Sequence, residues 1–408
     1  MVSVVLFIAA MLLFMGLFNQ TIQTATVYQQ HSALATKTSD LLDNMLLSSG
    51  TPVDWGKRRI NSTSPTGFGL HDEALAQYQL SPFSLMRLES SAGKPVNYEV
   101  GGQTTTYNNV TMNSGEYLLV PHSEVLNYSY ASKLLGTNGS YGFSLTLAPT
   151  VHVSISIVES LPTLTFSVNV TGTGLPLANS RVIYYLITVS GRDAPNSPVY
   201  NIYSGASSTD AGGMVTVSRD DVDVTQKSYA LIVSASVSGL SGVGYYSNSL
   251  HNSSYVVPLV SNFETGTVNL AHSYGILDDA GQNVTGSESL YYNVTFLPVS
   301  DMTRMSLNNG TGGSWVCGNL DASHRVDSVN LDTRNLGVLV VAYSTGASTS
   351  GVVVMPWGFS PLGFSVTFGG QPGQQEWVST DLRQVLVNNI PYQAKLMFWS
   401  NEGHKVIT

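Results

Sequence analysis

The sequence is poor in charge and in cysteine, and each shortage excludes a class of protein. Only 11% of the 408 residues are charged, which is less than half of the roughly 25% that globular domains usually carry. With 26 acidic and 17 basic residues the net charge is −9, which disfavours a nucleic-acid binder or a polybasic membrane-surface protein. The single cysteine, Cys317, excludes internal disulfides and zinc sites built from several thiolates.

The hydrophobic content is ordinary, so the shortage of charge does not indicate a disordered chain. Hydrophobic residues make up 43% of the sequence, which is enough to build packed cores. Abundant Ser, Thr, Asn and Tyr supply the polar surface instead of charge. A chain of this length buries enough surface to fold without disulfides.

Charge is missing altogether from the first part of the chain. Residues 1–18 contain one polar side chain, Ser3, and no Lys or Arg occurs before Lys37. The run is long enough to cross a bilayer, but it lacks the basic n-region of a secretory signal and a convincing cleavage site. We therefore expect either an unusual anchor or a chain whose basic leader has been removed.

Glycine and proline are absent from residues 17–49, and the apolar residues there follow a helical repeat. Val27, Leu34 and Leu41 recur every seven residues, as on one face of a helix. Gly50 and Pro52 are typical of a helix end. We predict one helix over residues 1–49, roughly 70 Å long, apolar all round in its first half and amphipathic in its second.

A helix that is apolar on every side needs partners on every side, either lipids or other copies of itself. A single-pass membrane anchor and a polymerisation helix are both open at this point. The residues that we expect to carry polymerisation are Val4, Val5, Phe7, Ile8, Met11, Leu12, Phe14, Met15, Phe18, Ile22, Val27, Leu34, Leu41 and Met45.

The helix exit and several later motifs resemble the archaeal branch of the type IV pilin superfamily. The helix runs into Gly50-Thr51-Pro52-Val53-Asp54-Trp55-Gly56, which is similar to the exit of many archaeal pilin-like proteins. Further similar stretches are Phe68-Gly69-Leu70, Ser81-Pro82-Phe83-Ser84-Leu85-Met86-Arg87-Leu88, and Leu134-Leu135-Gly136 leading to Tyr141-Gly142-Phe143.

The resemblance implies how the protein would be processed and assembled. In that superfamily a prepilin peptidase removes a short basic leader, and an ATPase-driven assembly platform extracts the subunit from the membrane into a filament whose core is a bundle of the helices. Bacterial pilins carry Glu at the fifth mature position, where this chain has Val5; archaeal pilins generally lack that Glu.

Beyond the helix we predict an α+β fold that is mostly β, with the long helix followed by β-sandwich domains. Two short helices are expected, one starting at Ser81-Pro82 and one over residues 123–135. Alternating strands separated by turns over residues 161–259 resemble immunoglobulin-like modules of surface proteins. The expected domains are a polymerisation helix (1–49), a β-rich headgroup (50–158), an immunoglobulin-like sandwich (159–259), and a C-terminal β region (260–408) that completes the headgroup or stands apart.

Further strands are expected in the C-terminal region, each bounded by Gly- or Ser-rich turns. Their ranges are 290–297, 337–344, 351–356, 363–368 and 392–399.

No catalytic motif is present in the sequence. There is no His-Glu-x-x-His, no Gly-x-Ser-x-Gly and no phosphate-binding loop, so we expect no enzyme and no cofactor. Paired carboxylates for glycoside hydrolysis are not recognisable from sequence because they lie far apart in a chain. The acidic clusters Asp220/Asp221/Asp223 and Asp278/Asp279/Asn283 could offer oxygens to calcium, but neither forms a full loop. The one basic run, Lys57-Arg58-Arg59, is interpreted as linker or inter-subunit contact.

Asn-x-Ser/Thr sequons are frequent and suggest a glycosylated extracellular surface. We expect N-linked glycans among Asn61, Asn109, Asn127, Asn138, Asn169, Asn252, Asn283, Asn293 and Asn309. Asn19 also lies in a sequon, but a bundled helix leaves no room for a sugar there.

Together these features predict a structural subunit of an extracellular, archaeal pilus-like filament for adhesion to surfaces or cells. Identical subunits are its expected partners, and it would reside in the membrane before assembly. The alternatives are a monomeric membrane-anchored surface protein, an anchored extracellular enzyme and, less favoured, an archaellum-type motility filament.

Overall fold

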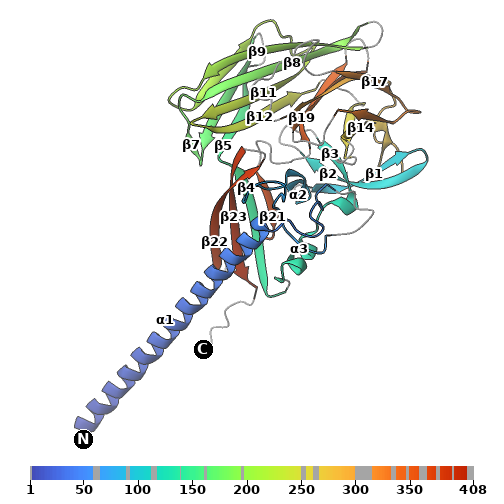
Figure 1. Ribbon diagram of the computed structural model, residues 1–408. Coiled ribbons are helices and arrows are strands. Elements are labelled where there is room, and N and C mark those ends of the chain that lie inside the picture. Colours follow the sequence, from blue (N-terminus) through green and yellow to red (C-terminus); the bar gives the residue numbers. More distant parts are fainter. Residues whose placement is uncertain are drawn as a thin grey trace.

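The computed structural model consists of one long helix and a large β-rich head (Figure 1). The structure describes residues 2–57, 65–88, 92–111, 117–137, 139–159, 163–193, 197–249, 254–260, 266–298, 315–331, 337–345, 349–357, 365–373, 377–387 and 390–401. The fold is α+β and mostly β, with several sheets packed face to face, which confirms the predicted fold class.

Helix α1 (Val2–Leu47) is continuous over 46 residues and ends two residues before the predicted boundary. The reason is the chain that crosses its C-terminus, where the amides of Leu70 and His71 donate to the carbonyls of Met45 and Ser48. These bonds satisfy carbonyls that a longer helix would otherwise have to bond internally. At Gly69 a Cβ would come within 2.2 Å of the Ser48 oxygen, so this crossing requires glycine.

The helix-exit motif is explained by packing. The Trp55 indole nitrogen donates to the carbonyl oxygen of Gly69 at 2.9 Å. The Gly56 carbonyl accepts from Arg87 Nε at 3.0 Å, and a Cβ at Gly56 would meet the Ser84 nitrogen at 2.3 Å. The Gly-x-Pro-x-Asp-Trp-Gly stretch therefore folds back against the segment that starts at Ser81.

The short helices follow the predicted caps only in part. Helix α2 (Pro82–Met86) begins after Ser81, whose hydroxyl accepts from the Ser84 nitrogen, as expected. The single helix predicted over 123–135 is wrong. The structure has a 3₁₀ turn η1 (His122–Glu124) and a separate helix α3 (Tyr128–Leu134), because the Asn127 side chain caps a new helix start by accepting from the Ser129 nitrogen at 2.8 Å.

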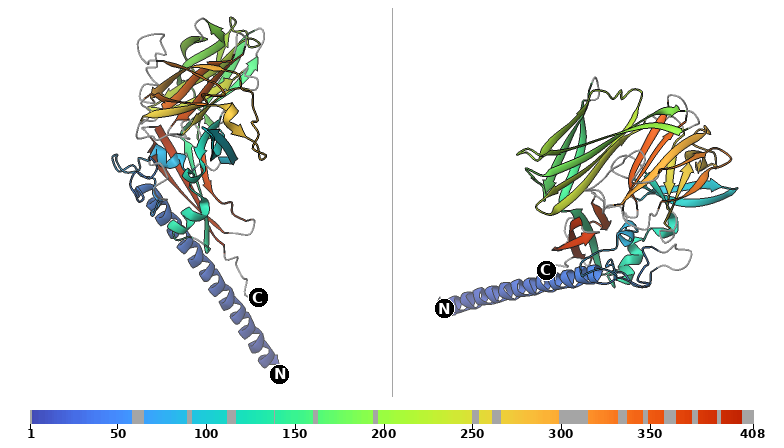
Figure 2. Two further views of the ribbon diagram at one scale, coloured as in Figure 1. Left: turned by 90° about the vertical axis from the view of Figure 1, so that its right-hand side faces the viewer. Right: turned by 45° about the horizontal axis from the view of Figure 1, so that its top comes forward.

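Four sheets form successive layers in the head (Figures 1 and 2). The outer sheet is β10-β6-β5, with β7 pairing β6. The first central sheet is β12-β11-β8-β9, the second central sheet is β17-β16-β19-β20, and the seven-stranded sheet is β15-β1-β2-β3-β13-β14-β18. The outer sheet consists of β5 (Val151–Glu159), β6 (Leu164–Gly172), β7 (Leu175–Pro176) and β10 (Met214–Arg219), and the first central sheet of β8 (Arg181–Asp193), β9 (Ser197–Ser208), β11 (Ser228–Val237) and β12 (Leu240–Asn248). The second central sheet consists of β16 (Leu290–Pro298), β17 (Val316–Leu320), β19 (Gly337–Ser344) and β20 (Ser350–Trp357). The seven-stranded sheet consists of β1 (Ala92–Val100), β2 (Gln103–Thr111), β3 (Tyr117–Pro121), β13 (Val256–Leu259), β14 (Thr267–His272), β15 (Ile276–Leu277) and β18 (Val326–Asn330). A 3₁₀ turn, η3 (Ser273–Gly275), follows β14.

Buried residues fill each gap between these layers. Phe166 and Leu231 lie in the core between the outer and first central sheets. Ile187 and Val340 belong to the core that joins the two central sheets. Leu339 of the second central sheet packs in one cluster with residues of the seven-stranded sheet. The central sheets are thus covered on both faces, which explains why β19 is buried along its whole length and its sequence is continuously apolar.

A fifth sheet supports the helix. The neck sheet has the order β21-β4-β23-β22, formed by β21 (Val366–Gly369), β4 (Tyr141–Pro149), β23 (Ile390–Ser400) and β22 (Val378–Val387). Its strand pairs join a segment that precedes the outer and first central sheets in the sequence to segments that follow them, as where Leu145 of β4 lies opposite Leu396 of β23. Likewise, β3 pairs in parallel with β13. Helix α1 contacts β22 and β23 of the neck sheet.

The strands predicted at 290–297, 337–344, 351–356 and 392–399 are confirmed as β16, β19, β20 and β23. The strand predicted at 363–368 is present as β21 from Val366; residues 361–364 lie outside the described residues.

Candidate functional site: the two halves of the long helix

Helix α1 divides into two parts that differ in what surrounds them. In the projecting half, residues 2–33, every side chain that the structure describes is exposed. Phe7 is 70% exposed and Phe14 is 72% exposed. In the docked half, residues 34–47, Leu42 and Met45 are 0% exposed. The part of the helix on the N-terminal side of Leu34 therefore projects away from the head (Figures 1 and 2).

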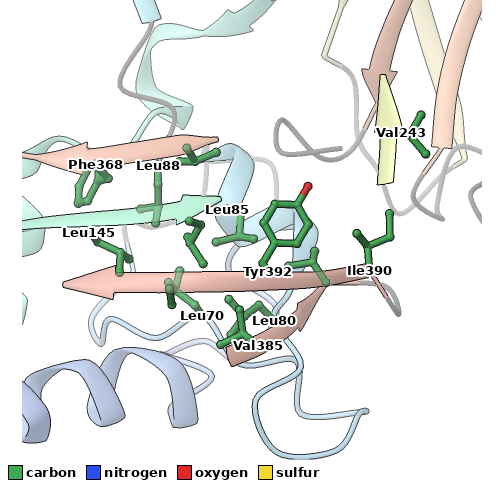
Figure 3. Packing of buried hydrophobic residues seen from close by; sticks show 14 of the residues in the cluster. Leu70, Leu80, Leu85, Leu88, Leu145, Val243, Phe368, Val385, Ile390 and Tyr392 are labelled. Atoms are coloured by element: carbon green, nitrogen blue, oxygen red, sulfur yellow. The ribbon is translucent and has the colours of Figure 1, made fainter. Parts of the chain in front are cut away.

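The docked half packs through one stripe. Leu34, Thr38, Leu41 and Met45 are buried, and their spacing of three or four residues places them on one side of the helix. The core that they join includes Leu145, Val385 and Tyr392 of the neck sheet, and Leu70, Leu80 and Leu85 of the segment after the helix (Figure 3). Burying each large aliphatic side chain contributes about 1.5–3 kcal/mol, so this stripe fixes the head on the helix.

A polar clamp on the rim of this contact involves Arg383 of β22. Its Nε donates to Asp43 Oδ1 at 3.0 Å and its Nη2 donates to Ser39 Oγ at 2.8 Å. A third bond joins Arg383 Nη1 to Asp381 Oδ1 at 2.7 Å. Burial works to raise the pKa of Asp381, but hydrogen bonds from Leu382, Ser39 and Arg383 outweigh it and hold that pKa below its usual range. The clamp thus keeps its charges and crosses from helix to sheet.

Two aromatic contacts lie where the docked half meets the projecting half. Lys37 Nζ donates to the Tyr141 hydroxyl at 2.6 Å and lies 4.5 Å from the centre of that ring. One and a half turns earlier, the His31 ring stacks on Trp377 with centroids 3.9 Å apart and planes inclined by 8°. These contacts mark the end of the interaction between the helix and its own head.

The projecting half carries no charged side chain: the first charged residue of α1 is Lys37. Its threonines are internally satisfied. Thr21, Thr24 and Thr26 each donate from the hydroxyl to the carbonyl four residues earlier, at 2.8, 2.8 and 2.9 Å. Because these donors already have partners, burying the threonines against another surface leaves no hydroxyl hydrogen unbonded. The amide side chains of Asn19, Gln20, Gln23, Gln29 and Gln30 are exposed on the same segment.

The structure separates the residues that we predicted to carry polymerisation into two groups. Ten of them are exposed on the projecting half: Val4, Phe7, Ile8, Met11, Leu12, Phe14, Met15, Phe18, Ile22 and Val27. Val5 belongs to the helix, but its side chain lies outside the described residues. Leu34, Leu41 and Met45 are a correction, because they are buried against the chain's own head and are at most 9% exposed.

The sequons lie in different environments. Asn127 and Asn283 are exposed, and Asn109 and Asn169 are partly buried on strands β2 and β6. Asn293 is 5% exposed, and its amide nitrogen, the atom that would carry a sugar, donates to Ser197 Oγ at 3.0 Å. That placement argues against a glycan at Asn293. The sequons at Asn61, Asn138, Asn252 and Asn309 lie outside the described residues.

Carboxylates of both acidic clusters accept hydrogen bonds from residues nearby in the sequence. Asp221 forms a two-pronged ion pair with Arg219, at 2.8 and 2.9 Å. Asp223 accepts from both the amide and the hydroxyl of Thr225, which lowers the pKa of its carboxyl. Asp278 accepts from the amides of Ala280 and Gln282 in a turn. Among the described residues no group of three or more His, Cys, Asp and Glu is arranged to hold a metal ion.

The basic run after the helix is described only at its first residue. Lys57 Nζ lies 5.3 Å from the centre of the Phe83 ring, which places it against α2. Arg58 and Arg59 lie outside the described residues.

Sequence patterns did not reveal the polar residues buried in the head. Arg87 is 1% exposed and reaches Glu124, whose carboxylate lies 3.7 Å away; burial lowers the pKa of Arg87, and Glu124 opposes that effect. His272 is fully buried, with Nδ1 accepting from the Tyr274 amide and Nε2 donating to the Glu288 carbonyl, and burial lowers its pKa. Arg87 lies in the Ser81–Leu88 stretch quoted for the resemblance, but nothing in that stretch indicates that its side chain is buried, and His272 belongs to no motif.

By length and composition, α1 is apolar enough to cross a membrane, and its most apolar window has no residue buried inside the structure. The chain is therefore compatible with a secreted or surface protein that has passed through, or stays in, a membrane.

Comparison with known proteins gives no family. No protein-family description matches the chain, and no curated protein does. Solved structures that match the chain include native alpha-2-macroglobulin from E. coli and alpha-2-macroglobulin from Salmonella reacted with methylamine, each 11% identical with a TM-score of 0.21. In both cases the match covers 72% of this chain and 22% of the other, so the chain spans about a fifth of the length of these proteins. Similarity at this level supports no statement about function.

Proposed function

We propose that this protein is the structural subunit, or pilin, of an extracellular archaeal type IV pilus-like filament, with adhesion to surfaces or cells as its expected role. The observation that carries the proposal is the projecting half of α1, which contains no Asp, Glu, Lys or Arg and whose described side chains are all exposed. In a filament, the same helix from neighbouring subunits would surround it.

The length of this half favours a helix bundle over lipid. At 1.5 Å per residue, residues 2–33 span roughly 48 Å, whereas the hydrocarbon core of a bilayer is about 30 Å thick. A membrane would therefore cover about 20 residues and leave about a dozen of the projecting half in water. A bundle of identical helices covers the whole length.

The composition of that remaining segment also favours a bundle. Residues 22–33 include the β-branched Ile22, Thr24, Thr26 and Val27, which form helices poorly. With no charged residue, the segment has no ion pairs between successive turns to compensate. Packing against neighbours would stabilise it, and its exposed amide side chains would find partners on adjacent helices.

Energetics then account for a stable extracellular polymer. In lipid the apolar side chains gain little by moving next to other helices, since both surroundings are apolar. Outside the membrane the alternative is water, and each large side chain returned to water costs about 1.5–3 kcal/mol. Assembly from the membrane thus needs work from a machine, as the resemblance implies for the assembly ATPase, and the finished filament does not dissociate readily.

A monomeric membrane-anchored surface protein is the second candidate, because the length and apolarity of α1 also suit a single membrane span. It differs from the filament in what surrounds residues 22–33. An anchored enzyme and a motility filament have no observation of their own in their favour.

Electron microscopy of material sheared from native cells tests the proposal. We expect filaments in which this chain is the repeating subunit and from which it is not released by mild detergent. Detergent extraction of the chain as a single folded species from the membrane fraction, with no filaments in the sheared fraction, would overturn the proposal in favour of the anchor.

A further inference from the structure

From Val199 on, the edge of the first central sheet at strand β9 has no charge or proline of its own to discourage pairing with another strand. The guanidinium of Arg219 on β10 lies 4.2 Å from the centre of the Tyr203 ring, within an ion pair with Asp221. An edge strand presents unpaired N–H and C=O groups, and proteins usually shield it with charge, proline, a covering element or short length. Residues 199–208 of β9 contain neither a charged residue nor proline. Apart from the ladder to β8, no backbone hydrogen bond joins this stretch to the other described residues.

The other terminal strands are short or protected. Asp381 and Arg383 lie on β22, Arg219 on β10 and Asp327 on β18. The uncharged β12 and the terminal strand β5 of the outer sheet cover each other: a Cβ at Gly242 would come within 2.3 Å of the Val151 oxygen and one at Gly244 within 2.5 Å of the Val153 oxygen. Strands β15, β17 and β21 are at most five residues long.

Strand β20 is protected in a different way. The Ser249 hydroxyl donates to the Val352 carbonyl and accepts from its amide, both at 3.0 Å. Among the sheet edges that the structure describes, the β9 edge, residues 199–208, is therefore the long one that is left open.

The side chains of the β9 edge suit pairing with a second copy of itself. Ser204, Ala206, Ser207 and Ser208 are small and exposed, and Asn201 is exposed among them. A chain of net charge −9 repels its own copies in general, but residues 204–208 carry no charge, and the Arg219 beside Tyr203 is neutralised by its ion pair with Asp221. Two copies of one strand run antiparallel when related by a twofold axis, and an antiparallel ladder satisfies both edges equally.

The position of the β9 edge determines which copies could meet. It lies at the end of the head remote from α1 (Figures 1 and 2). If the helices form the filament axis, β9 faces outward. A twofold contact between outward edges cannot join successive subunits along one polar filament, whose contacts are head to tail. It joins subunits of two different filaments lying side by side.

We infer that the β9 edge is a self-association surface through which neighbouring filaments pair laterally into bundles, by antiparallel β9–β9 ladders. The inference rests on the proposed filament function. Each ladder is a weak contact, but a filament repeats it along its length, so the contacts add up.

The test uses full-length protein in sheared native filaments and the variant S204K/A206K. Two lysines per strand place like charges near each other across the ladder, which destabilises strand pairing. Since bundling multiplies the loss over many subunits, the fraction of filaments in bundles should fall by more than about tenfold, while single filaments of normal length remain. The matched control S154K/S156K places the same charges on exposed positions of β5, and should bundle as wild type does.

A cross-linking experiment keeps the inference falsifiable if the lysine variant misfolds. With Cys317→Ser as background, single cysteines at Ser204, Ala206 and Ser208 should give covalent dimers, without larger species, in bundled filaments for at least one of the three positions. Wild-type filaments that never bundle, or bundles that persist in S204K/A206K and give no dimer at any position, would overturn the inference and leave the filament proposal standing. Absence of filaments altogether would instead reject the proposed function.

Discussion

The two halves of helix α1 are continuous in backbone but opposite in environment. The docked half presents a stripe of apolar residues to one side, where the neck sheet and the segment after the helix cover it. The projecting half is apolar all round near its N-terminus. None of its described side chains is buried, and the head reaches it at His31, which stacks on Trp377. One helix thus has a single neighbour at one end and room for neighbours on all sides at the other.

This difference teaches that the distribution of apolar residues around a helix predicts how many surfaces it meets. A stripe with a helical period is satisfied by one surface. An apolar circumference is satisfied only by lipid or by a bundle. The change from one to the other lies between His31 and Leu34, where the contacts with Trp377 and the core begin.

A charge introduced into the projecting half is expected to have the largest effect on filament assembly. Leu12→Arg should abolish filaments, because a lone charge cannot be buried among apolar helices without a partner and its burial would cost several kcal/mol. The head should fold normally, since Leu12 is 64% exposed and contacts nothing there. Electron microscopy of sheared cell-surface material, with an immunoblot for total protein, measures both outcomes.

The matched control is Thr216→Arg, which adds the same charge to an exposed position of β10. It should leave filaments intact. Normal filaments from Leu12→Arg would show that this part of the helix is not in the filament core.

In the docked half the corresponding change acts on the head instead. Met45→Ala removes a fully buried side chain and should lower the free energy of unfolding of the head by about 2–5 kcal/mol. Filaments should still form at low temperature, because the projecting half is unchanged. Thermal melting followed by tryptophan fluorescence of purified filaments measures the loss; Met11→Ala, on the projecting half, should leave that melting temperature unchanged.

Much of this division could be predicted from the sequence, and its limits have physical causes. The α1 helix was visible because its apolar residues recur locally and glycine and proline are missing before Gly50. The stripe of Leu34, Leu41 and Met45 was visible too, but not what covers it. Amphipathic periodicity reports that one face is buried without saying whether the neighbour is the same chain or another copy.

The polar clamp lay beyond any sequence pattern. Arg383 and Asp43 are 340 residues apart in the chain and meet only because β22 pairs at the edge of the neck sheet. The central sheets show the same limit: the continuous apolar run of β19 indicates burial on both faces, but only the strand pairing shows which sheets cover it.

Lowering the pH should affect the docked half and its head but not the projecting half, without any mutation. Burial depresses the pKa of His272 in the folded head, while the unfolded chain has the ordinary value near 6.5. Below about pH 6.5 the unfolded state therefore binds more protons, and the stability of the head falls as the pH decreases. Residues 2–30 of the projecting half contain no Asp, Glu, Lys, Arg or His, so filament integrity should not change between pH 7.5 and pH 5.

Melting temperatures of the head and electron micrographs of the same filament samples at pH 7.5, 6 and 5 test this prediction. His272→Gln, which can both donate and accept a hydrogen bond but does not titrate, should flatten the dependence of the melting temperature on pH. Filaments that dissociate at pH 5 while the head stays folded would show that the contacts between subunits, rather than the head, are sensitive to acid.

The polar clamp should contribute less than the buried stripe. Arg383 and Asp43 are 27% and 37% exposed, so water and salt screen their attraction, and Arg383→Met should cost about 1 kcal/mol. The loss should shrink in high salt. Arg219→Met, which breaks an ion pair on β10 remote from the helix, is the matched control. A loss as large as that of Met45→Ala would mean that charge, rather than the apolar stripe, holds the head on the helix.

The smallest expected effect gives the finest test of what surrounds the projecting half. Gly16 lies within α1, and a Cβ there would meet nothing within 4 Å in this chain. In an isolated helix Gly16→Ala should be favourable by up to about 1 kcal/mol, and lipid would accommodate the methyl group. If helices of neighbouring subunits approach closely at this glycine, the methyl group is instead in the way. We then expect the denaturant concentration that dissociates filaments to decrease in the order wild type, Gly16→Ala, Gly16→Leu. Filaments of Gly16→Ala that are more resistant than wild type would mean that helix propensity alone decides at this position, with no close neighbour there.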